Sequence, residues 1–192
     1  MDGRPVGQSA ASQAPRVLIY HKKVGELVTR SDPQGRPTVF EHLPAGRWVA
    51  IGRLDINSSG LLLFTDSGEL ANRLMHPRYQ VEREYLARVQ GRLGKNELEK
   101  LASGVQLEDG PASFDRIDPV QGRESSSGAN RWYRVMLREG RKREVRRLFE
   151  AVGGRVSRLT RVRYGPFSLP RDLAAGQWRE VPAREAEVLF RP

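Results

Sequence analysis

The chain has 192 residues, of which 38% are hydrophobic, and it contains no cysteine. This length is sufficient for one large domain, or for two small lobes that share a sizeable core. The lack of cysteine excludes disulfides, thiol catalysis and cysteine-bound zinc, and it is typical of a reducing compartment, so we expect a cytoplasmic location. Residues 1–15 contain no apolar signal segment, and no apolar run reaches about 18 residues, so we expect no membrane partner.

The charge is strongly basic and unevenly distributed. The formal net charge is +10, and 28 of the 33 basic residues are arginine. Residues 131–163 hold twelve Arg or Lys and three Glu, a net charge of +9, so the rest of the chain is nearly neutral. Such clustering favours a nucleic acid partner over a merely solvated surface. The arginine excess suits forked phosphate contacts, although a GC-rich genome would also produce it.

In the first half of the chain, apolar patterns predict strands at residues 17–22, 48–52, 60–65 and 81–89. Between the last two strands, an apolar stripe at residues 70–75 predicts a helix. Asp66 is the expected N-cap of this helix, with Glu69 completing a capping box and Pro77 ending the helix.

In the second half, a helix is expected at residues 95–102, ended by Gly104, and strands at residues 114–120 and 132–138 flank a Gly/Ser loop at residues 121–130. The next helix follows Gly140, with apolar residues at positions 145, 148, 149 and 152, and Gly153 and Gly154 end it. A strand at residues 155–164 is expected to point Leu159, Arg161 and Arg163 in one direction. A strand at residues 177–181 and a helix at residues 184–190 close the chain.

Strands outnumber helices, and short turns join several of them. This pattern predicts an α+β fold with a mixed, largely antiparallel central sheet flanked by helices. Residues 1–15 are polar and are expected to form a flexible tail, which leaves residues 16–192 as the folded domain.

One polar segment between two predicted strands stands out as a candidate site. It reads Gly52-Arg53-Leu54-Asp55-Ile56-Asn57-Ser58-Ser59-Gly60 and presents one carboxylate beside one guanidinium. Loops between buried strands often carry catalytic groups, because a rigid scaffold positions them. The same residues also fit a turn with an Asx cap, so the segment alone leaves both interpretations open.

Five motifs in order make the segment more specific. Gly52-Arg53-Leu54-Asp55 with Ser59-Gly60-Leu61-Leu62-Leu63-Phe64-Thr65-Asp66 is followed by Leu74-Met75-His76-Pro77, then Glu82-Arg83-Glu84-Tyr85, then Glu139-Gly140-Arg141-Lys142-Arg143-Glu144-Val145-Arg146-Arg147, and then Arg161-Val162-Arg163-Tyr164-Gly165-Pro166. Together they resemble the RsuA/RluB/RluE/RluF family of ribosomal RNA pseudouridine synthases, over residues 16 to 182. Within the family, the sequences of these motifs are most similar to the branch that acts on the large ribosomal subunit.

The resemblance implies an enzyme that converts a uridine in ribosomal RNA, here 23S rRNA, to its C-glycoside isomer, with no cofactor and no metal. Asp55 resembles the family's essential carboxylate, which attacks the sugar at C1′ or helps to form a glycal. Tyr85 would stack on the uracil and take its C5 proton, since a base drawn out of a stack needs a flat aromatic surface. Arg146 would pair with Asp55 and hold it ionised. On the residues alone, Tyr85 equally fits a core aromatic and Arg146 a phosphate contact.

Further residues are expected to bind the RNA. Arg53 would fill the space that the flipped base leaves, and Leu159 would pack under the sugar or base. The residues expected to contact phosphates are Arg141, Lys142, Arg143, Arg161 and Arg163. The three histidines have no ligand spacing, so no metal site is expected.

The chain departs from the family pattern in two places. Members of the family usually begin with a small S4 RNA-binding domain, whereas residues 1–15 resemble only the end of such a domain, a linker remnant. Lys23 stands where the family commonly has proline. We expect a monomer.

Two other classes compete with the enzyme. A non-catalytic rRNA-binding or ribosome assembly factor would use the same basic surface but would not need Asp55 with Tyr85 and Arg146. A metal-dependent nuclease would need clustered carboxylates, whereas the segment at Asp55 offers one. Within the family, 16S rRNA is the alternative substrate.

Overall fold

The computed structural model describes residues 14–123 and 127–188. The predicted tail therefore lies almost wholly outside the described residues, as do part of the predicted Gly/Ser loop and the end of the predicted last helix. The described helices are α1 (Gly68–Met75), α2 (Lys95–Ser103), α3 (Glu144–Ala151) and α4 (Ala183–Val188), with short 3-10 helices at Val39–His42 and Pro77–Tyr79.

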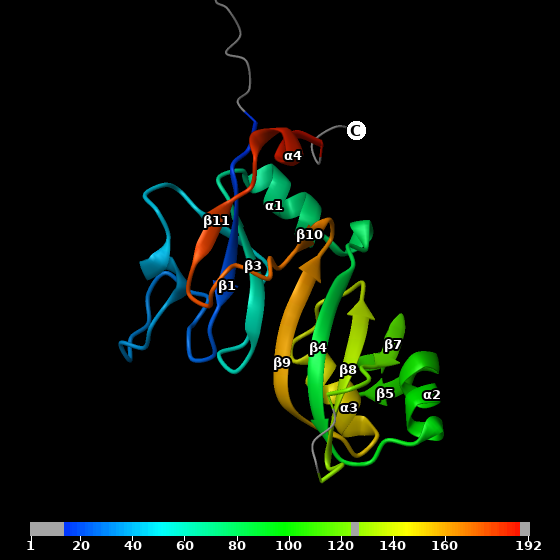
Figure 1. Ribbon diagram of the computed structural model, residues 1–192. Coiled ribbons are helices and arrows are strands. Elements are labelled where there is room, and N and C mark those ends of the chain that lie inside the picture. The colour runs from blue at the N-terminus through cyan, green and yellow to red at the C-terminus, as the bar shows by residue number, and fades with distance from the viewer. Residues whose placement is uncertain (1–13, 124–126, 189–192) are drawn as a thin grey trace, which may run out of the picture.

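A single large sheet organises the described residues (Figure 1). Its strands are β1 (Val17–Lys22), β2 (Val49–Ile51), β3 (Ser59–Thr65), β4 (Arg83–Gln90), β7 (Arg116–Pro119), β8 (Asn130–Leu137), β9 (Arg155–Tyr164), β10 (Phe167–Ser168) and β11 (Trp178–Glu180). The order is β11-β1-β3-β9-β4-β8-β7, with β2 paired to β3 and β10 to β9. Within the described part of the chain, β3 and β9 are the one parallel pair. The predicted α+β fold with a mixed, largely antiparallel sheet is confirmed.

The parallel pair joins two halves of the sheet through a short contact. Only Ser59 with Thr160 and Gly60 with Arg161 are in register, and the two strands diverge beyond them (Figure 1). On one side of this junction, β1 and β3 are apolar on both faces, because two separate clusters cover them. On the other side, β4, β8 and β9 turn one face toward a third cluster that includes α3.

Gly60 makes this contact possible. Its φ is +105°, and a Cβ atom there would lie 2.2 Å from the carbonyl oxygen of Arg161. An L-residue is strained at this φ, and the neighbouring atom is backbone that cannot rotate away. The sequence therefore needs glycine as the second residue of β3, at the end of the candidate segment.

The start of α1 differs from the prediction by one residue. Ser67, not Asp66, is the N-cap, and its side chain accepts a hydrogen bond from the backbone N–H of Leu70. Asp66 instead accepts from the backbone N–H of Arg16 at 2.8 Å, next to β1. A tertiary contact thus takes the carboxylate that local sequence rules assign to the cap.

The sequence did not indicate a small hairpin beside α3. Strands β5 (Val105–Leu107) and β6 (Gly110–Ala112) pair as a separate two-stranded sheet. Each strand has only three residues, too few for a period of two to be recognised. The strand predicted at residues 114–120 is present as β7, but it is shorter and covers only Arg116–Pro119.

We expect Gly60→Ala to lower the free energy of unfolding by about 2 to 4 kcal/mol, because it combines a strained φ with a backbone clash. Urea unfolding followed by circular dichroism measures this change. Gly68→Ala is the matched control, since no atom lies within 4 Å of its added Cβ and its φ is ordinary. The control should change stability by less than about 1 kcal/mol. Equal effects of the two substitutions would show that the β3–β9 contact does not depend on Gly60.

Candidate active site

The segment from Gly52 to Ser58 connects β2 to β3 and carries Asp55. Leu54 is buried and packs in the same cluster as Tyr85 and Leu159. The backbone N–H of Ser58 donates to the carbonyl oxygen of Asp55 at 2.9 Å, which closes a turn. The loop is thus fixed on both sides of Asp55, while the Asp55 side chain is 35% exposed and open to a ligand.

Two arginines of one helix approach the carboxylate. Arg143 Nη1 lies 3.7 Å from Asp55 Oδ2, and Arg146 Nε lies 4.0 Å from the same oxygen. Arg143 is the N-cap of α3 and has a left-handed backbone, with φ +53°. The structure thus brings together Asp55 and Arg146, which the resemblance pairs, and adds Arg143, which was expected only as a phosphate contact.

Arg146 also holds the loop that carries Asp55. It is 7% exposed, and its Nη2 donates to the carbonyl oxygen of Asn57 at 3.1 Å and to Ser58 Oγ at 3.2 Å. Burial lowers the pKa of Arg146, with Arg143 as the second cause and Asp55 acting in the opposite direction. Its Nε is buried and has no hydrogen-bond partner among the described residues. A small closure toward Asp55 would give this N–H the partner that a buried donor requires.

Lys22 is a second buried cation at the loop, and the sequence analysis assigned it no role. It is fully buried, and Nζ donates to the carbonyl oxygens of Ser58 at 2.7 Å and Lys23 at 2.8 Å. Burial lowers the pKa of Lys22 to about 8, while Glu26 and Asp55 act in the opposite direction. The sequence feature that could have indicated this role is the position of Lys22 at the end of an apolar, buried strand, β1.

Tyr85 and Leu159 lie on neighbouring strands that face the same cluster. In the β4–β9 pair, Tyr85 is opposite Arg161 and Ala87 is opposite Leu159. Tyr85 and Leu159 are 9% and 7% exposed. Together with Leu54 they form an apolar floor beside the Asp55 loop.

The expectation for Arg161 is wrong in one respect, because the residue is 2% exposed and not on the surface. Its Nε donates to the carbonyl oxygen of Leu61 at 2.9 Å, and its guanidinium stacks on Tyr164 at 4.9 Å. Arg161 therefore supports the start of β3, where a phosphate cannot reach it. The expected common direction of Leu159, Arg161 and Arg163 is also wrong, since a register shift between Glu84 and Tyr85 turns Arg163 outward.

Carboxylates hold two of the arginines that were expected to bind phosphate. Arg163 contacts Glu82 at 2.8 Å and Glu84 at 3.1 Å. Arg141 contacts Asp109 at 3.2 Å and Glu139 at 3.1 Å. By contrast, Lys142 and Arg53 are exposed and make no ion pair within the described ranges.

Asp109 ties the hairpin of β5 and β6 to α3. Arg147 Nη1 and Nη2 donate to the two carboxylate oxygens of Asp109 at 2.7 and 3.0 Å. This forked bond lowers the pKa of Asp109. The hairpin thereby fixes the helix that presents Arg143 and Arg146 to Asp55.

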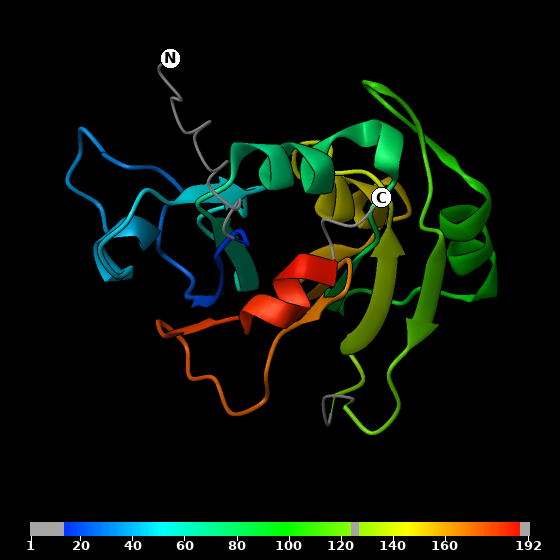
Figure 2. The ribbon, with the colours of Figure 1, turned by 90° about the horizontal axis from the view of Figure 1, so that it is seen from above.

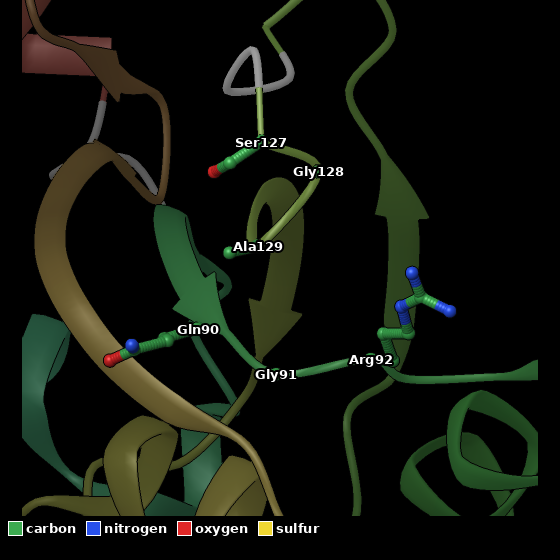
Figure 3. A pocket seen from close by; sticks show the side chains of 6 residues that line it. All are labelled: Gln90, Gly91, Arg92, Ser127, Gly128 and Ala129. Carbon is green, nitrogen blue, oxygen red and sulfur yellow. The ribbon is translucent and has the colours of Figure 1, made fainter.

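Residues 14–123 and 127–188 contain no group of three His, Cys, Asp or Glu side chains able to hold a metal ion. None of the described helices is long and apolar enough to cross a membrane. A hollow of about 360 Å³ lies at the end of β4 and is lined by Gln90, Gly91, Arg92, Ser127, Gly128 and Ala129 (Figure 3). It includes none of the residues around Asp55, so the candidate site is an open surface and not this hollow.

The structure thus places an aspartate beside two arginines near the junction of the sheet, next to an apolar floor. A family model described as RNA pseudouridylate synthase matches residues 16–151. The chain belongs to this family, which confirms the resemblance of its motifs.

Individual relatives carry a more specific name. A "Ribosomal large subunit pseudouridine synthase B" of Yersinia pestis is 59% identical over 91% of this chain and 54% of its own length. The proteins of that name from Escherichia coli K12 and Pseudomonas aeruginosa are each 54% identical, over 98% and 95% of this chain and 65% and 47% of their own lengths. The chain thus spans about half to two thirds of the length of the curated relatives that it matches.

Solved structures support the fold. One described as "Crystal structure of pseudouridylate synthase" has a TM-score of 0.77 and 26% identity, over 93% of this chain and 75% of that chain. Another, "Structure of H/ACA RNP bound to a substrate RNA containing 2'-deoxyuridine", has a TM-score of 0.59 and 19% identity, over 83% of this chain and 50% of that chain, and shows the likeness of fold alone.

The buried Glu144 at the start of α3 predicts a pH dependence of stability. Burial, with Glu139 as the second cause, raises the pKa of Glu144 from 4.5 to about 7. A raised carboxyl pKa means that the folded state binds the proton more tightly, so the stabilisation is present at low pH and is lost as the pH rises through about 7. We expect the free energy of unfolding to fall by about 1 to 3 kcal/mol between pH ~4.5 and pH ~7.5 because of this group.

Urea unfolding at several pH values in that window tests the expectation. Glu144→Gln retains an oxygen for the backbone N–H of Arg141, now at 2.9 Å, and should remove the fall. Glu150→Gln, an exposed change on the same helix, is the control and should leave it in place. A fall of unchanged size in Glu144→Gln would assign the pH dependence to another group.

Proposed function

We propose that the chain isomerises a specific uridine of 23S ribosomal RNA to pseudouridine, with Asp55 as the catalytic carboxylate and with no metal or cofactor. The observation that carries the proposal is the position of Asp55, 3.7 and 4.0 Å from two guanidinium groups and open on one side. The relatives named as large-subunit enzymes support the choice of RNA. Ribosomal RNA as substrate also supports a cytoplasmic location, and we propose that the enzyme acts as a monomer through residues 16–192.

The reaction needs an anionic group beside the sugar. The bond between N1 of the uracil and C1′ of the ribose breaks, the base rotates, and a bond forms between C5 and C1′. C5 then loses its proton and N1 gains one, so that no atom is lost. Asp55 would assist the first step, by attack on C1′ or through a glycal. Arg143 and Arg146 attract the carboxylate across 3.7 and 4.0 Å, an attraction that solvent weakens because the carboxylate is one third exposed.

The apolar floor suits the base. We assign Tyr85 to stacking on the uracil and to removal of the C5 proton, and Leu159 to packing beneath the sugar or base. Both side chains belong to the same buried cluster as Leu54, the residue before Asp55. Arg53 is exposed on the same loop and is assigned to the space that the flipped nucleotide vacates.

The phosphate contacts divide into two groups. Lys142 and Arg143 are exposed at the start of α3 and are available to the RNA. Arg141 and Arg163 would bind phosphate only by exchanging their present carboxylate partners. We withdraw Arg161 from this group because of its burial.

Asp55→Asn tests the chemistry with an isosteric change. We expect pseudouridine formation in 23S rRNA transcripts to fall by a factor of about 10⁴ or more, the scale seen when a catalytic nucleophile is removed. Pseudouridine is detected by carbodiimide-dependent reverse-transcription stops. Asp115→Asn, an exposed aspartate distant in sequence, is the matched control and should retain full activity.

Three outcomes separate the alternatives. A stop in 23S rRNA that only the Asp55 variant lacks supports the proposal. A stop confined to 16S rRNA would move the substrate to the small subunit. RNA binding with no stop in either RNA would contradict the enzyme and favour a binding or assembly factor.

Turnover should be insensitive to chelation. The isomerisation proposed above uses the Asp55 carboxylate and the Tyr85 side chain, and no step in it involves a metal ion. EDTA added to the transcript assay should therefore leave the initial rate within about twofold of the untreated rate, once a monovalent salt replaces magnesium for RNA folding. A collapse that zinc or magnesium restores in a prefolded RNA would reveal a metal requirement.

A further inference from the structure

The sheet has a second face that the candidate active site does not use. Along β4, Tyr85, Ala87 and Val89 point toward the cluster under α3, so Leu86 and Arg88 point to the opposite side. Figure 1 shows α3 behind β4 and β8, with no helix in front of these two strands, and Figure 2 shows the same arrangement from above. The half of the sheet built from β4, β8 and β9 is therefore open on the side away from Asp55.

Arginines of three strands meet on this open side. Arg88 is directly opposite Arg158 of β9 and Trp132 of β8, and Arg155 is opposite Gln90 at the end of β4. Arg134 of β8 lies one step further along the same face, opposite Leu86. We call this set, Arg88, Trp132, Arg134, Arg155 and Arg158, the basic sheet face. Arg134, Arg155 and Arg158 are exposed, and Arg88 and Trp132 are half-buried.

The charges on the basic sheet face are unevenly neutralised. Toward one end, Glu84 lies 3.7 Å from Arg134 and 3.1 Å from Arg163. Arg88, Arg155 and Arg158 make no ion pair with any carboxylate in the part of the chain that the structure describes. Two like charges directly opposite each other on neighbouring strands destabilise the sheet. Arg88 and Arg158 are in that arrangement, and an anion between them would remove the cost.

An aromatic side chain lies among these cations. Trp132 is the cross-strand neighbour of Arg88, and the guanidinium of Arg123 lies over its ring at 5.7 Å. Guanidinium forks match phosphate oxygens, and a half-buried indole can still offer the exposed part of its ring as a stacking plane to an unpaired base. An acidic protein would also satisfy the charges, but it would have no particular use for the ring.

We propose that the basic sheet face binds the phosphate backbone of a second segment of the ribosomal RNA substrate, on the side of the sheet opposite Asp55. The proposal rests on the proposed function only in the choice of RNA. The segment held at Asp55 cannot also cover this face, because the sheet lies between them. A large RNA that reaches both surfaces should therefore bind more tightly than a short RNA around the target uridine, which reaches only the surface at Asp55.

A triple variant, Arg88→Gln with Arg155→Gln and Arg158→Gln, tests the proposal. The matched control replaces three exposed arginines elsewhere, Arg47, Arg171 and Arg184, with glutamine. Filter binding measures Kd over a range of KCl concentrations, with two RNAs. One is full-length 23S rRNA transcript, and the other is the shortest fragment of it that the unmodified chain still binds.

For the long RNA, the triple variant should bind about ten to a hundred times more weakly at ~0.1 M KCl, with a log–log salt slope reduced by about two to three. For the short fragment, its Kd should stay within about twofold, since that RNA does not reach the face. The control should retain the salt slope of the unmodified chain with the long RNA.

Two results would overturn the proposal: an unchanged salt slope with the long RNA, or an equal loss with both RNAs. The binding measurement does not require turnover. An absence of pseudouridine would therefore count against the proposed function and leave this test intact. If the variant loses long-RNA affinity and still modifies the short fragment at the normal rate, both proposals stand.

Discussion

The close approach of β3 and β9 at Gly60 is the constraint on which the rest of the structure depends. Two residue pairs hold the parallel strands together, and a side chain at Gly60 would meet the backbone of Arg161. The chain enters this contact directly from the Asp55 loop. The loop carbonyls of Asn57 and Ser58 and the adjoining carbonyl of Leu61 therefore face an interior boundary, where buried cations satisfy them: Arg146, Lys22 and Arg161. Because these buried cations donate hydrogen bonds to the carbonyl oxygens, the cost of removing their charges from water is partly offset, and the loop is held in position.

The basic charge of the chain thus has several separate uses. Arg146 holds the loop, and Arg147 binds Asp109 and fixes the hairpin against α3. Arg143 and Lys142, on the same helix, remain exposed. A net charge of +9 between residues 131 and 163 predicts a polyanion partner, but it does not distinguish structural arginines from available ones. Only the positions of the carboxylates make that distinction.

Local patterns predicted most of the strands, because alternation and apolar runs report burial directly. The motif order predicted the family and placed Asp55 and Arg146 together. The features that escaped prediction depend on contacts distant in sequence. Asp109 lies more than thirty residues from the arginines that it binds, and the cap of α1 moved to Ser67 because Arg16 occupies Asp66. The burial of Lys22 depends likewise on Ser58, which lies in the Asp55 loop directly before β3.

The register of β9 shows the same limit most clearly. Continuous pairing from Val89 and Val156 would place Arg158 opposite Ala87, inside the apolar cluster. An extra residue at Ser157 instead places Arg158 opposite Arg88, on the open face. Continuous pairing from Tyr85 and Arg161 would likewise turn Arg163 inward, and the extra Val162 turns it out to Glu84. Each irregularity thus keeps one arginine out of the core, since a shift of one residue exchanges the faces of a strand. The two bulges separate Arg161, which supports the Asp55 junction from within, from the arginines that the same strand presents to the opposite side.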